Sequence, residues 1–442
     1  MESLYQYLWK YRLLGDSLVT VGGCDVKVLY PGVHNRDAGP DFSGARVRIG
    51  DQEWCGNVEV HVRASDWFRH RHDSDPAYGN VILHVVGIND AAVHGPSGEV
   101  IPQIVATFPE SFVRLYARLS ENISSVACAG DLAGVPPLVV TDWTGSLAVE
   151  RMQMKARRVL DTLGHLEGDW EWTCFVTLAR SLGFGLNGDP LEMLARSLPL
   201  RILARHSDDL MQTEALLFGQ AGMLDTSTHI FDSYYQGLCR EYLFLARKYG
   251  LRPMRRDLWK FARSRPQNFP TRRIALLARA LHGGFSLLSR LTAPGCGCEE
   301  SRSLLDWRLD GYWTEHLDFD MSGTRLPASL SAAARDLLLV NFVAPLLYAF
   351  GVSRGNPDQA ERGLDMWREL DAENNSFIRR WKGAGIPCRD AMDSQGLLHL
   401  SKEYCDRGRC LECRFGHFLL RDAAGRCNSS SAWSGNIRSL TQ

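Results

Sequence analysis

The sequence predicts an α/β domain at the amino terminus, a mainly α-helical domain after it and a small cysteine-rich tail. Three observations support this organisation. Short strand-like runs fill much of the first hundred residues, helical apolar spacing prevails from about residue 142 to residue 381, and four cysteines lie within residues 388–413. A chain of 442 residues is also too long for one core of ordinary size. We therefore expect domains at residues 1–135, 136–385 and 386–430.

The elements of the amino-terminal domain follow from the spacing of its apolar residues. The opening stretch MESLYQYLWKYRLL has helical apolar spacing. In GNVEVHVR apolar and polar residues alternate, as in a strand with one buried face, whereas VILHVV is nearly all apolar, as in a strand buried on both faces. The expected elements are a helix at Glu2–Leu14 and strands at Asp25–Tyr30, Gly44–Ile49, Gly56–Arg63 and Val81–Val86.

Two carboxylates and an imidazole stand out on these strands. Asp41 follows a proline just before one strand, and Glu59 and His61 share one face of the next because side chains alternate along a strand. Mg²⁺ favours a few carboxylate oxygens and can both neutralise a phosphate and activate a water. We therefore expect Asp41 and Glu59 to bind Mg²⁺ or Mn²⁺ and His61 to orient or deprotonate the water. Glu2 is the one acid of the opening helix and a further candidate ligand.

This arrangement resembles the PD-(D/E)XK pattern of the restriction-endonuclease-like nucleases. The expected order of helix, strands and helix also resembles that superfamily. The resemblance implies a mixed sheet flanked by helices and metal-dependent cleavage of phosphodiester bonds. His61 stands where the pattern usually has lysine, and an imidazole is not a permanent cation.

A second group of possible ligands follows directly. It comprises Asp66, His70, His72, Asp75 and His84. Histidine and aspartate at such short spacing are typical ligands of Zn²⁺ or a similar ion in a metallohydrolase. The alternative is a polar helix and turn at the surface, with His84 satisfied inside the sheet.

The helical region contains a segment rich in basic residues. Between Arg247 and Arg273 there are ten lysines and arginines against one acid, with aromatic residues interleaved. Such a segment favours a polyanion, whose phosphates contact the cations while its bases stack on the rings. Arg151, Lys155, Arg157 and Arg158 extend the same surface in this interpretation, and the alternative is a set of solvated helix faces. The expected nucleic-acid-binding residues are Arg255, Arg256, Lys260, Arg263, Arg265, Arg272 and Arg273.

The cysteines of the tail have the spacing of metal ligands. Cys388, Cys405, Cys410 and Cys413 supply four thiols within a short segment, and a tetrahedral Zn²⁺ site needs four ligands. The C-x4-C-x2-C core also has the spacing of a ferredoxin-type iron–sulfur site. His417 and Cys427 are alternative fourth ligands, and buried reduced thiols without a metal are the remaining possibility.

The overall composition of the chain does not indicate a particular class of binding partner. The formal net charge is −1, with 45% hydrophobic and 23% charged residues, so an electrostatic argument has to be local. No uninterrupted apolar run reaches the roughly 18–20 residues that cross a bilayer, and the opening stretch lacks the features of a signal peptide. We expect a cytoplasmic protein with no membrane partner.

Several longer motifs resemble a bacterial family named domain of unknown function 2851. They include N-x-x-A-G-P-D-F at Asn35–Phe42, GNVEVH at Gly56–His61, W-K-x-x-R-x-R-P-x-N-F-P-T-R-R at Trp259–Arg273, and the segment Ser394–Cys413. The resemblance implies a bacterial origin and one architecture over nearly the whole chain, and it implies no activity.

These features together favour a metal-dependent nuclease acting on DNA or RNA. One alternative is a non-catalytic nucleic-acid-binding or scaffold protein with a nuclease-like fold. The other is a metallohydrolase built on the histidine and aspartate group.

Overall fold

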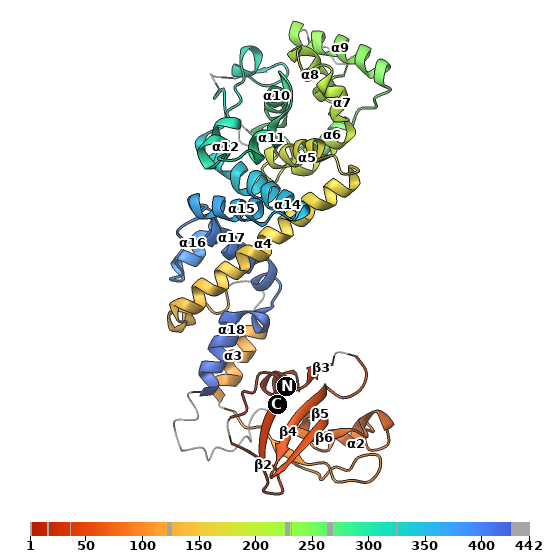
Figure 1. The fold of residues 1–442 in the computed structure, drawn as a ribbon, viewed down its shortest axis with the longest axis vertical. Helices are drawn as coiled ribbons and strands as arrows, with labels where there is room; N and C mark the ends of the chain where they lie inside the picture. The colour runs from red at the N-terminus through yellow and green to blue at the C-terminus, as the bar shows by residue number, and fades with distance from the viewer. Residues whose placement is uncertain are drawn as a thin grey trace. The chain divides into compact units, whose positions relative to one another are not determined.

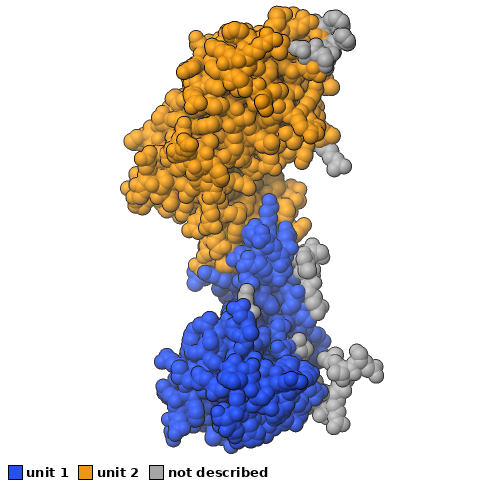
Figure 2. Space-filling view, turned by 90° about the vertical axis from the view of Figure 1, so that its right-hand side faces the viewer, with its two compact units in different colours: residues 1–141, 401–442 blue, residues 142–400 orange. Residues whose placement is uncertain are grey.

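The computed structural model describes residues 2–425 apart from positions 16, 36, 109, 122–125, 226–229, 231, 263–267 and 324–325. The chain divides into unit 1, residues 1–141 with 401–442, and unit 2, residues 142–400 (Figure 2). The division after Thr141 lies near the expected end of the α/β domain. The expected tail, 386–430, does not form a unit of its own, because its part from Ser401 onward belongs to unit 1.

Unit 1 is built on a seven-stranded mixed sheet (Figure 1). Its order is β1-β2-β4-β5-β6-β7, and β3 pairs with β4 off this path. Strands β2, β4 and β5 are antiparallel neighbours, whereas β5, β6 and β7 run parallel. The strands are β1 (Leu18–Val19), β2 (Asp25–Tyr30), β3 (Val33–His34), β4 (Phe42–Ile49), β5 (Gln52–Arg63), β6 (Val81–Ile88) and β7 (Gln103–Val105).

Helices flank this sheet and connect its parallel strands. A parallel pair needs a crossover connection, and between β5 and β6 this is made by α2 and η1. The helical elements of unit 1 are α1 (Glu2–Lys10), α2 (Asp66–Arg69), η1 (Pro76–Tyr78), α3 (Glu110–Glu121), η2 (Ala129–Gly134), η7 (Leu400–Cys405), η8 (Cys410–Glu412) and α18 (Arg414–Gly425). Helix α1 ends before the expected Leu14, because Arg12 adopts a left-handed backbone with φ of 53°.

The two faces of β5 differ as the sequence alternation predicts. Val58 and Val60 are fully buried in a cluster with Tyr5 and Trp9 of α1. Fully burying one such side chain stabilises the fold by roughly 1.5–3 kcal/mol. Glu59 lies between these valines in the strand and pairs in register with His84 of β6. The side chains of Glu59 and its neighbours on that face are therefore directed away from α1.

Unit 2 is almost entirely helical, with one two-stranded antiparallel ribbon. Its helices are α4 (Pro137–His165), which begins before the unit boundary, α5 (Trp170–Leu182), α6 (Gly188–Ser197), α7 (Leu200–Ala204), α8 (Leu210–Gln220), α9 (Ser233–Tyr249), η3 (Arg256–Leu258), α10 (Pro270–Leu281), α11 (Leu287–Thr292), α12 (Cys298–Leu304), η5 (Gly311–Thr314), α13 (Ala332–Leu338), η6 (Leu339–Val343), α14 (Ala344–Arg354), α15 (Pro357–Glu369), α16 (Ser376–Gly383) and α17 (Ala391–His399); the ribbon is β8 (His316–Asp318) and β9 (Met321–Ser322).

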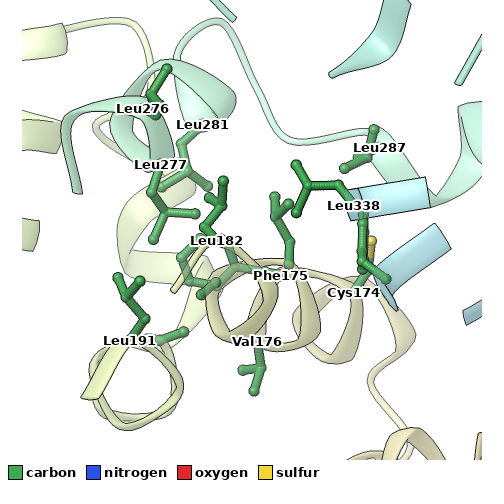
Figure 3. Packing of buried hydrophobic residues seen from close by; sticks show 14 of the residues in the cluster. Cys174, Phe175, Val176, Leu182, Leu191, Leu276, Leu277, Leu281, Leu287 and Leu338 are labelled. Carbon is green, nitrogen blue, oxygen red and sulfur yellow. The ribbon is translucent and has the colours of Figure 1, made fainter. Parts of the chain in front are cut away.

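One large apolar cluster holds these helices together. Phe175 and Leu182 of α5 lie against Leu277 and Leu281 of α10 in its interior (Figure 3). All four side chains are at most 1% exposed, so the helical apolar spacing of the sequence corresponds to real core faces.

One described stretch, Ala332–Arg354, is long and apolar enough by length and composition to cross a bilayer. Polar and charged residues interrupt this stretch, so it contains no uninterrupted apolar run of that length. Of its most apolar window, 61% is buried inside the protein, as in a core helix of a soluble protein.

Candidate functional site

Asp41 directly precedes β4, and Glu59 lies on the neighbouring antiparallel strand β5. The backbone N–H of Asp41 donates to Glu59 Oε2 over 3.0 Å, and the N–H of Val60 donates to Asp41 Oδ2 over 3.1 Å. Gln6 of α1 donates to the other oxygen, Oδ1, over 2.8 Å. Burial and the nearby Glu59 raise the pKa of Asp41 to about 7, and Glu2 contributes in the same direction. The structure thus brings Asp41 and Glu59 together, and Glu2 lies close enough to act electrostatically on Asp41.

The second oxygen of Glu59 faces a group of histidines. Glu59 Oε1 lies 3.5 Å from His61 Nε2 and 3.4 Å from His72 Nε2. His61 Nε2 also lies 3.2 Å from His70 Nδ1. The ligand atoms of the three histidines all fall within 4.8 Å of one another. We call Glu59, His61, His70 and His72 the histidine–glutamate site.

These separations match those between ligands of a single metal ion. A tetrahedral ion with bonds of about 2.0–2.1 Å holds neighbouring ligand atoms about 3.3–3.4 Å apart. The three separations of 3.2, 3.4 and 3.5 Å are close to this value. Three imidazoles and one carboxylate suit Zn²⁺ or another transition ion better than Mg²⁺, which prefers an all-oxygen shell. The donor set therefore disfavours the Mg²⁺ expected from the sequence.

His84 determines which nitrogen of His61 is available. His61 Nδ1 lies 2.9 Å from His84 Nε2, so His61 Nε2 is left to point toward the site. Burial, together with the neighbouring histidines, lowers the pKa of both imidazoles to about 3. Both rings are therefore neutral at physiological pH, which is the form that binds a metal. A ligating histidine usually donates its other N–H to a supporting group, and His84 occupies that place.

The elements around the site separate a closed side from an open one. His72 stacks on Tyr78 with ring centroids 3.7 Å apart and meets Trp67 edge-on at 5.3 Å. His72 is buried, whereas His70 is exposed. Burial and the charges of Glu59 and Asp41 raise the pKa of Tyr78 to about 12. The site is therefore exposed at His70 and buried at its other three residues.

Two exposed basic residues are the sequence neighbours of His70. Arg69 and Arg71 are exposed on either side of His70. Arg71 has a left-handed backbone, with φ of 61°, which is unusual for a residue with a long side chain. This conformation belongs to the tight turn that brings His70 and His72 to the site. The turn thus places positive charge beside the exposed ligand.

Asp66 and Asp75 have local structural roles instead of binding a metal. Asp66 Oδ2 accepts from the N–H of Arg63, and its other oxygen pairs with Arg69 at 3.0 Å. Asp75 caps the short helix η1 by accepting from the N–H of Ala77. The polar-turn interpretation therefore describes these two aspartates, whereas His70 and His72 join His61.

Only some basic residues of the segment from Arg247 to Arg273 in unit 2 are exposed. Arg272 and Arg273 are 2% and 3% exposed, so the expectation that they contact phosphates is wrong. Arg272 donates to the backbone carbonyls of Trp313 and Pro327, and Arg273 donates to Asn268. Arg151 is also buried and donates to Gln395.

The other predicted phosphate contacts have different surroundings. Arg255 is exposed and pairs with Asp257, and Arg256 lies 3.9 Å from Asp318. Lys260 is exposed, and its backbone is fixed by Asn187. Arg263 and Arg265 lie outside the described residues. Elsewhere in unit 2, a cleft of about 630 Å³ is lined by several basic residues, namely Lys155, Arg157, Arg158 and Arg180.

The predicted cysteine ligands are divided between the two units. Cys405, Cys410 and Cys413 belong to unit 1, whereas Cys388 belongs to unit 2. Burial raises the pKa of Cys388 to about 11, and the charged groups that act on it are those of Lys382, Asp390, Asp393 and Glu373. The structure thus groups only three of the four predicted cysteines. Cys427 lies outside the described residues.

Comparisons with known proteins identify a family and no activity. The model of the family described as "Protein of unknown function (DUF2851)" matches residues 2–376. No curated protein and no solved structure matches the chain.

Proposed function

The chain belongs to the DUF2851 family of proteins of unknown function, and we propose that it is a metal-dependent hydrolase that cleaves phosphodiester bonds in DNA or RNA. The observation that carries the proposal is the convergence of Glu59, His61, His70 and His72. The separations are 3.2 Å between His61 and His70, 3.5 Å between Glu59 and His61, and 3.4 Å between Glu59 and His72. The metal is Zn²⁺ or Mn²⁺ and the site lies in unit 1.

Some residues of the site would bind the metal ion, and others would orient these ligands. A bound ion of this class supplies Lewis acidity to a phosphoryl oxygen and lowers the pKa of a water. Glu59 and the three histidines hold the ion, and His84 keeps His61 in the required tautomer. Asp41 fixes Glu59 through its backbone N–H, and Gln6 fixes Asp41 from α1. Glu59 and His61 therefore each have a supporting partner, as ligands of catalytic metal sites usually do.

Two features support an anionic phosphodiester as the substrate. Arg69 and Arg71 flank the exposed ligand His70, where they can neutralise a phosphate. The succession of α1, the antiparallel strands β2, β4 and β5, the short helix α2 and the parallel strand β6 also resembles the order expected of the restriction-endonuclease-like nucleases. The exposed cations Arg255, Arg256 and Lys260 of unit 2 are the remaining candidates for backbone contacts. We also propose a cytoplasmic location, where the thiols stay reduced.

The experiment measures metal content and cleavage in the same preparations. Purified full-length protein is analysed for bound metal and incubated with labelled single- and double-stranded DNA and RNA in the presence of Zn²⁺, Mn²⁺ or Mg²⁺. The variants are His61→Ala and Glu59→Gln. Their matched controls are His94→Ala, an exposed histidine of the same unit, and Glu53→Gln, an exposed glutamate of the same strand.

We expect cleavage with Zn²⁺ or Mn²⁺ that is lost in both site variants and kept in both controls. Metal-dependent hydrolysis of a small phosphodiester without cleavage of any nucleic acid would leave the metal site intact and refute the substrate class. Nucleic-acid binding without cleavage, unchanged in Glu59→Gln, would favour the scaffold alternative instead.

A further inference from the structure

Four cysteines from distant parts of the sequence meet in unit 1. Cys128 directly precedes η2, Cys405 ends η7, Cys410 begins η8, and Cys413 directly precedes α18. The short helix η2 packs against α18, and α3 packs against both η8 and α18. In Figure 1, α3 and α18 run side by side. The chain entering η2 and the chain leaving η8 are therefore brought to the same place.

The thiols of these residues are buried together. Cys128, Cys410 and Cys413 are 7%, 8% and 6% exposed, and Cys405 is partly buried. The thiol of Cys128 lies close enough to Cys413 and Cys410 to interact with them electrostatically. The thiol of Cys405 interacts in the same way with Cys413, Cys128 and Cys410. Each of these groups thus lies within electrostatic reach of the others.

We propose that Cys128, Cys405, Cys410 and Cys413 form a four-thiolate metal centre that binds either one Zn²⁺ ion or one iron–sulfur cluster. Both cofactors take four cysteine thiolates, and the C-x4-C-x2-C spacing of the last three residues is found in iron–sulfur proteins. Cys128 replaces Cys388, which lies in unit 2 among other charged groups.

The segment that contains Cys410 and helix α18 pack closely against each other beside the proposed centre. A Cβ atom added to Gly416 of α18 would lie 2.1 Å from the carbonyl oxygen of Cys410, so only glycine permits this approach. The N–H of His417 donates to the carbonyl of Cys413 over 2.9 Å. Helix α18 is thereby fixed directly behind the last ligand.

The centre also connects to the helix that supports the histidine–glutamate site. His417 Nδ1 lies 3.2 Å from the hydroxyl of Tyr7, and its ring packs on Tyr11 with centroids 4.5 Å apart. Tyr7 is the neighbour of Gln6 on α1, and Gln6 donates to Asp41. The four-thiolate centre therefore fastens the carboxyl-terminal segment to α1. Any effect of the four-thiolate centre on catalysis, through Gln6 and Asp41, rests on the proposed function.

The test counts metal and sulfur in full-length protein carrying His61→Ala, so that the histidine–glutamate site does not contribute. Zinc, iron and acid-labile sulfide are measured per chain after anaerobic purification, together with visible absorption. The variants Cys128→Ser and Cys410→Ser are compared with Cys388→Ser and Cys427→Ser. We expect the metal to be lost in the first two and kept in the last two. Zinc without sulfide identifies a Zn²⁺ site, and iron with sulfide and visible absorption identifies a cluster.

A second measurement keeps the test valid if Cys128→Ser does not fold. X-ray absorption at the metal edge of Cys388→Ser and Cys427→Ser, in the same His61→Ala background, should show cysteine sulfur as the only protein ligand. Full metal content in Cys128→Ser, or loss of metal in Cys388→Ser or Cys427→Ser, would overturn the assignment. Because the His61→Ala protein is tested without reference to cleavage, failure here and failure of the proposed hydrolase are separate results.

Discussion

Replacing His84 with phenylalanine separates metal binding from stability in the histidine–glutamate site. His84 is fully buried, with a ring centroid 5.3 Å from that of Trp67, and its Nε2 lies 2.9 Å from His61 Nδ1. Phenylalanine fills nearly the same volume but offers no acceptor to His61. Loss of such a supporting group typically weakens metal affinity about 10–100-fold. This corresponds to about 1.4–2.8 kcal/mol.

The free energy of unfolding of the metal-free protein should change much less than the free energy of metal binding. The substitution leaves His61 Nδ1 buried without a partner, which costs about 1–3 kcal/mol. It also removes His84 Nδ1, a buried nitrogen that has no hydrogen-bond partner among the described residues, and the two effects are opposite in sign. We expect His84→Phe to keep its melting temperature in the presence of a chelator while it binds Zn²⁺ about 10–100-fold more weakly.

The assay is competition for Zn²⁺ against a chelator of known affinity, with calorimetric melting of the metal-free protein. His84→Gln is the matched variant, because its side-chain oxygen can still accept from His61, and it should retain most of the affinity. Parent-like affinity in a folded His84→Phe protein would refute the role assigned to His84.

Three further predictions concern the rest of the fold. Burial raises the pKa of Glu214 to about 7 from a usual 4.5, so its contribution to stability is fully present below about pH 4.5 and is lost as the pH rises through 7. The parent protein should therefore lose up to about 3 kcal/mol of unfolding free energy between pH 5 and pH 8, and urea unfolding of Glu214→Gln should not show this loss. Arg272→Leu should lower the free energy of unfolding by about 2–4 kcal/mol, because it leaves buried backbone carbonyls without a donor. The control Arg255→Leu, at an exposed position, should leave the free energy of unfolding nearly unchanged. Gly87→Ala would place its Cβ 2.1 Å from the hydroxyl of the buried Tyr5, so we expect thermal unfolding to show a loss of about 1–3 kcal/mol as α1 is displaced.

The local pattern of the sequence predicts the central strands of unit 1 well. The expected strand at Asp25–Tyr30 is observed at those bounds, and the expected strands at Gly56–Arg63 and Val81–Val86 lie within β5 and β6. Period-two alternation is a property of neighbouring residues, so it can be read without knowing the fold. The short strands β1 and β7 were not predicted, because their few residues contain too little pattern.

The site residues that could be predicted are those placed by local alternation along a strand, and the others are placed by the fold. Glu59 and His61 share a strand face, which the alternation gives directly. His70 and His72 lie in the turn after α2, where no periodicity applies, and their position depends on the crossover to β6 and on the left-handed Arg71. Their membership in one site with Glu59 was therefore not readable from the spacing.

Charge density along the sequence was misleading for a related reason. Arg272 and Arg273 lie in the first turn and a half of α10, whose first nine residues are all buried. Several backbone carbonyls of the segment from Trp313 to Pro327 point toward this helix and need donors. A guanidinium supplies several donors at once, so these arginines are required inside the unit. The number of cations in a segment does not reveal which of them face inward.

The carboxyl-terminal segment shows how much of the site depends on contacts that are distant in sequence. Phe415 and Leu420 of α18 are fully buried and Leu419 is 5% exposed. At roughly 1.5–3 kcal/mol for each buried side chain, their packing contributes about 5–9 kcal/mol, which is comparable with the whole stability of a typical domain. Because α18 also holds Tyr7 through His417, this packing acts on α1 and, through the neighbouring Gln6, on Asp41. The segment after Leu400 is therefore part of the structure that orients the acidic side of the site, although the sequence alone describes it as a separate tail.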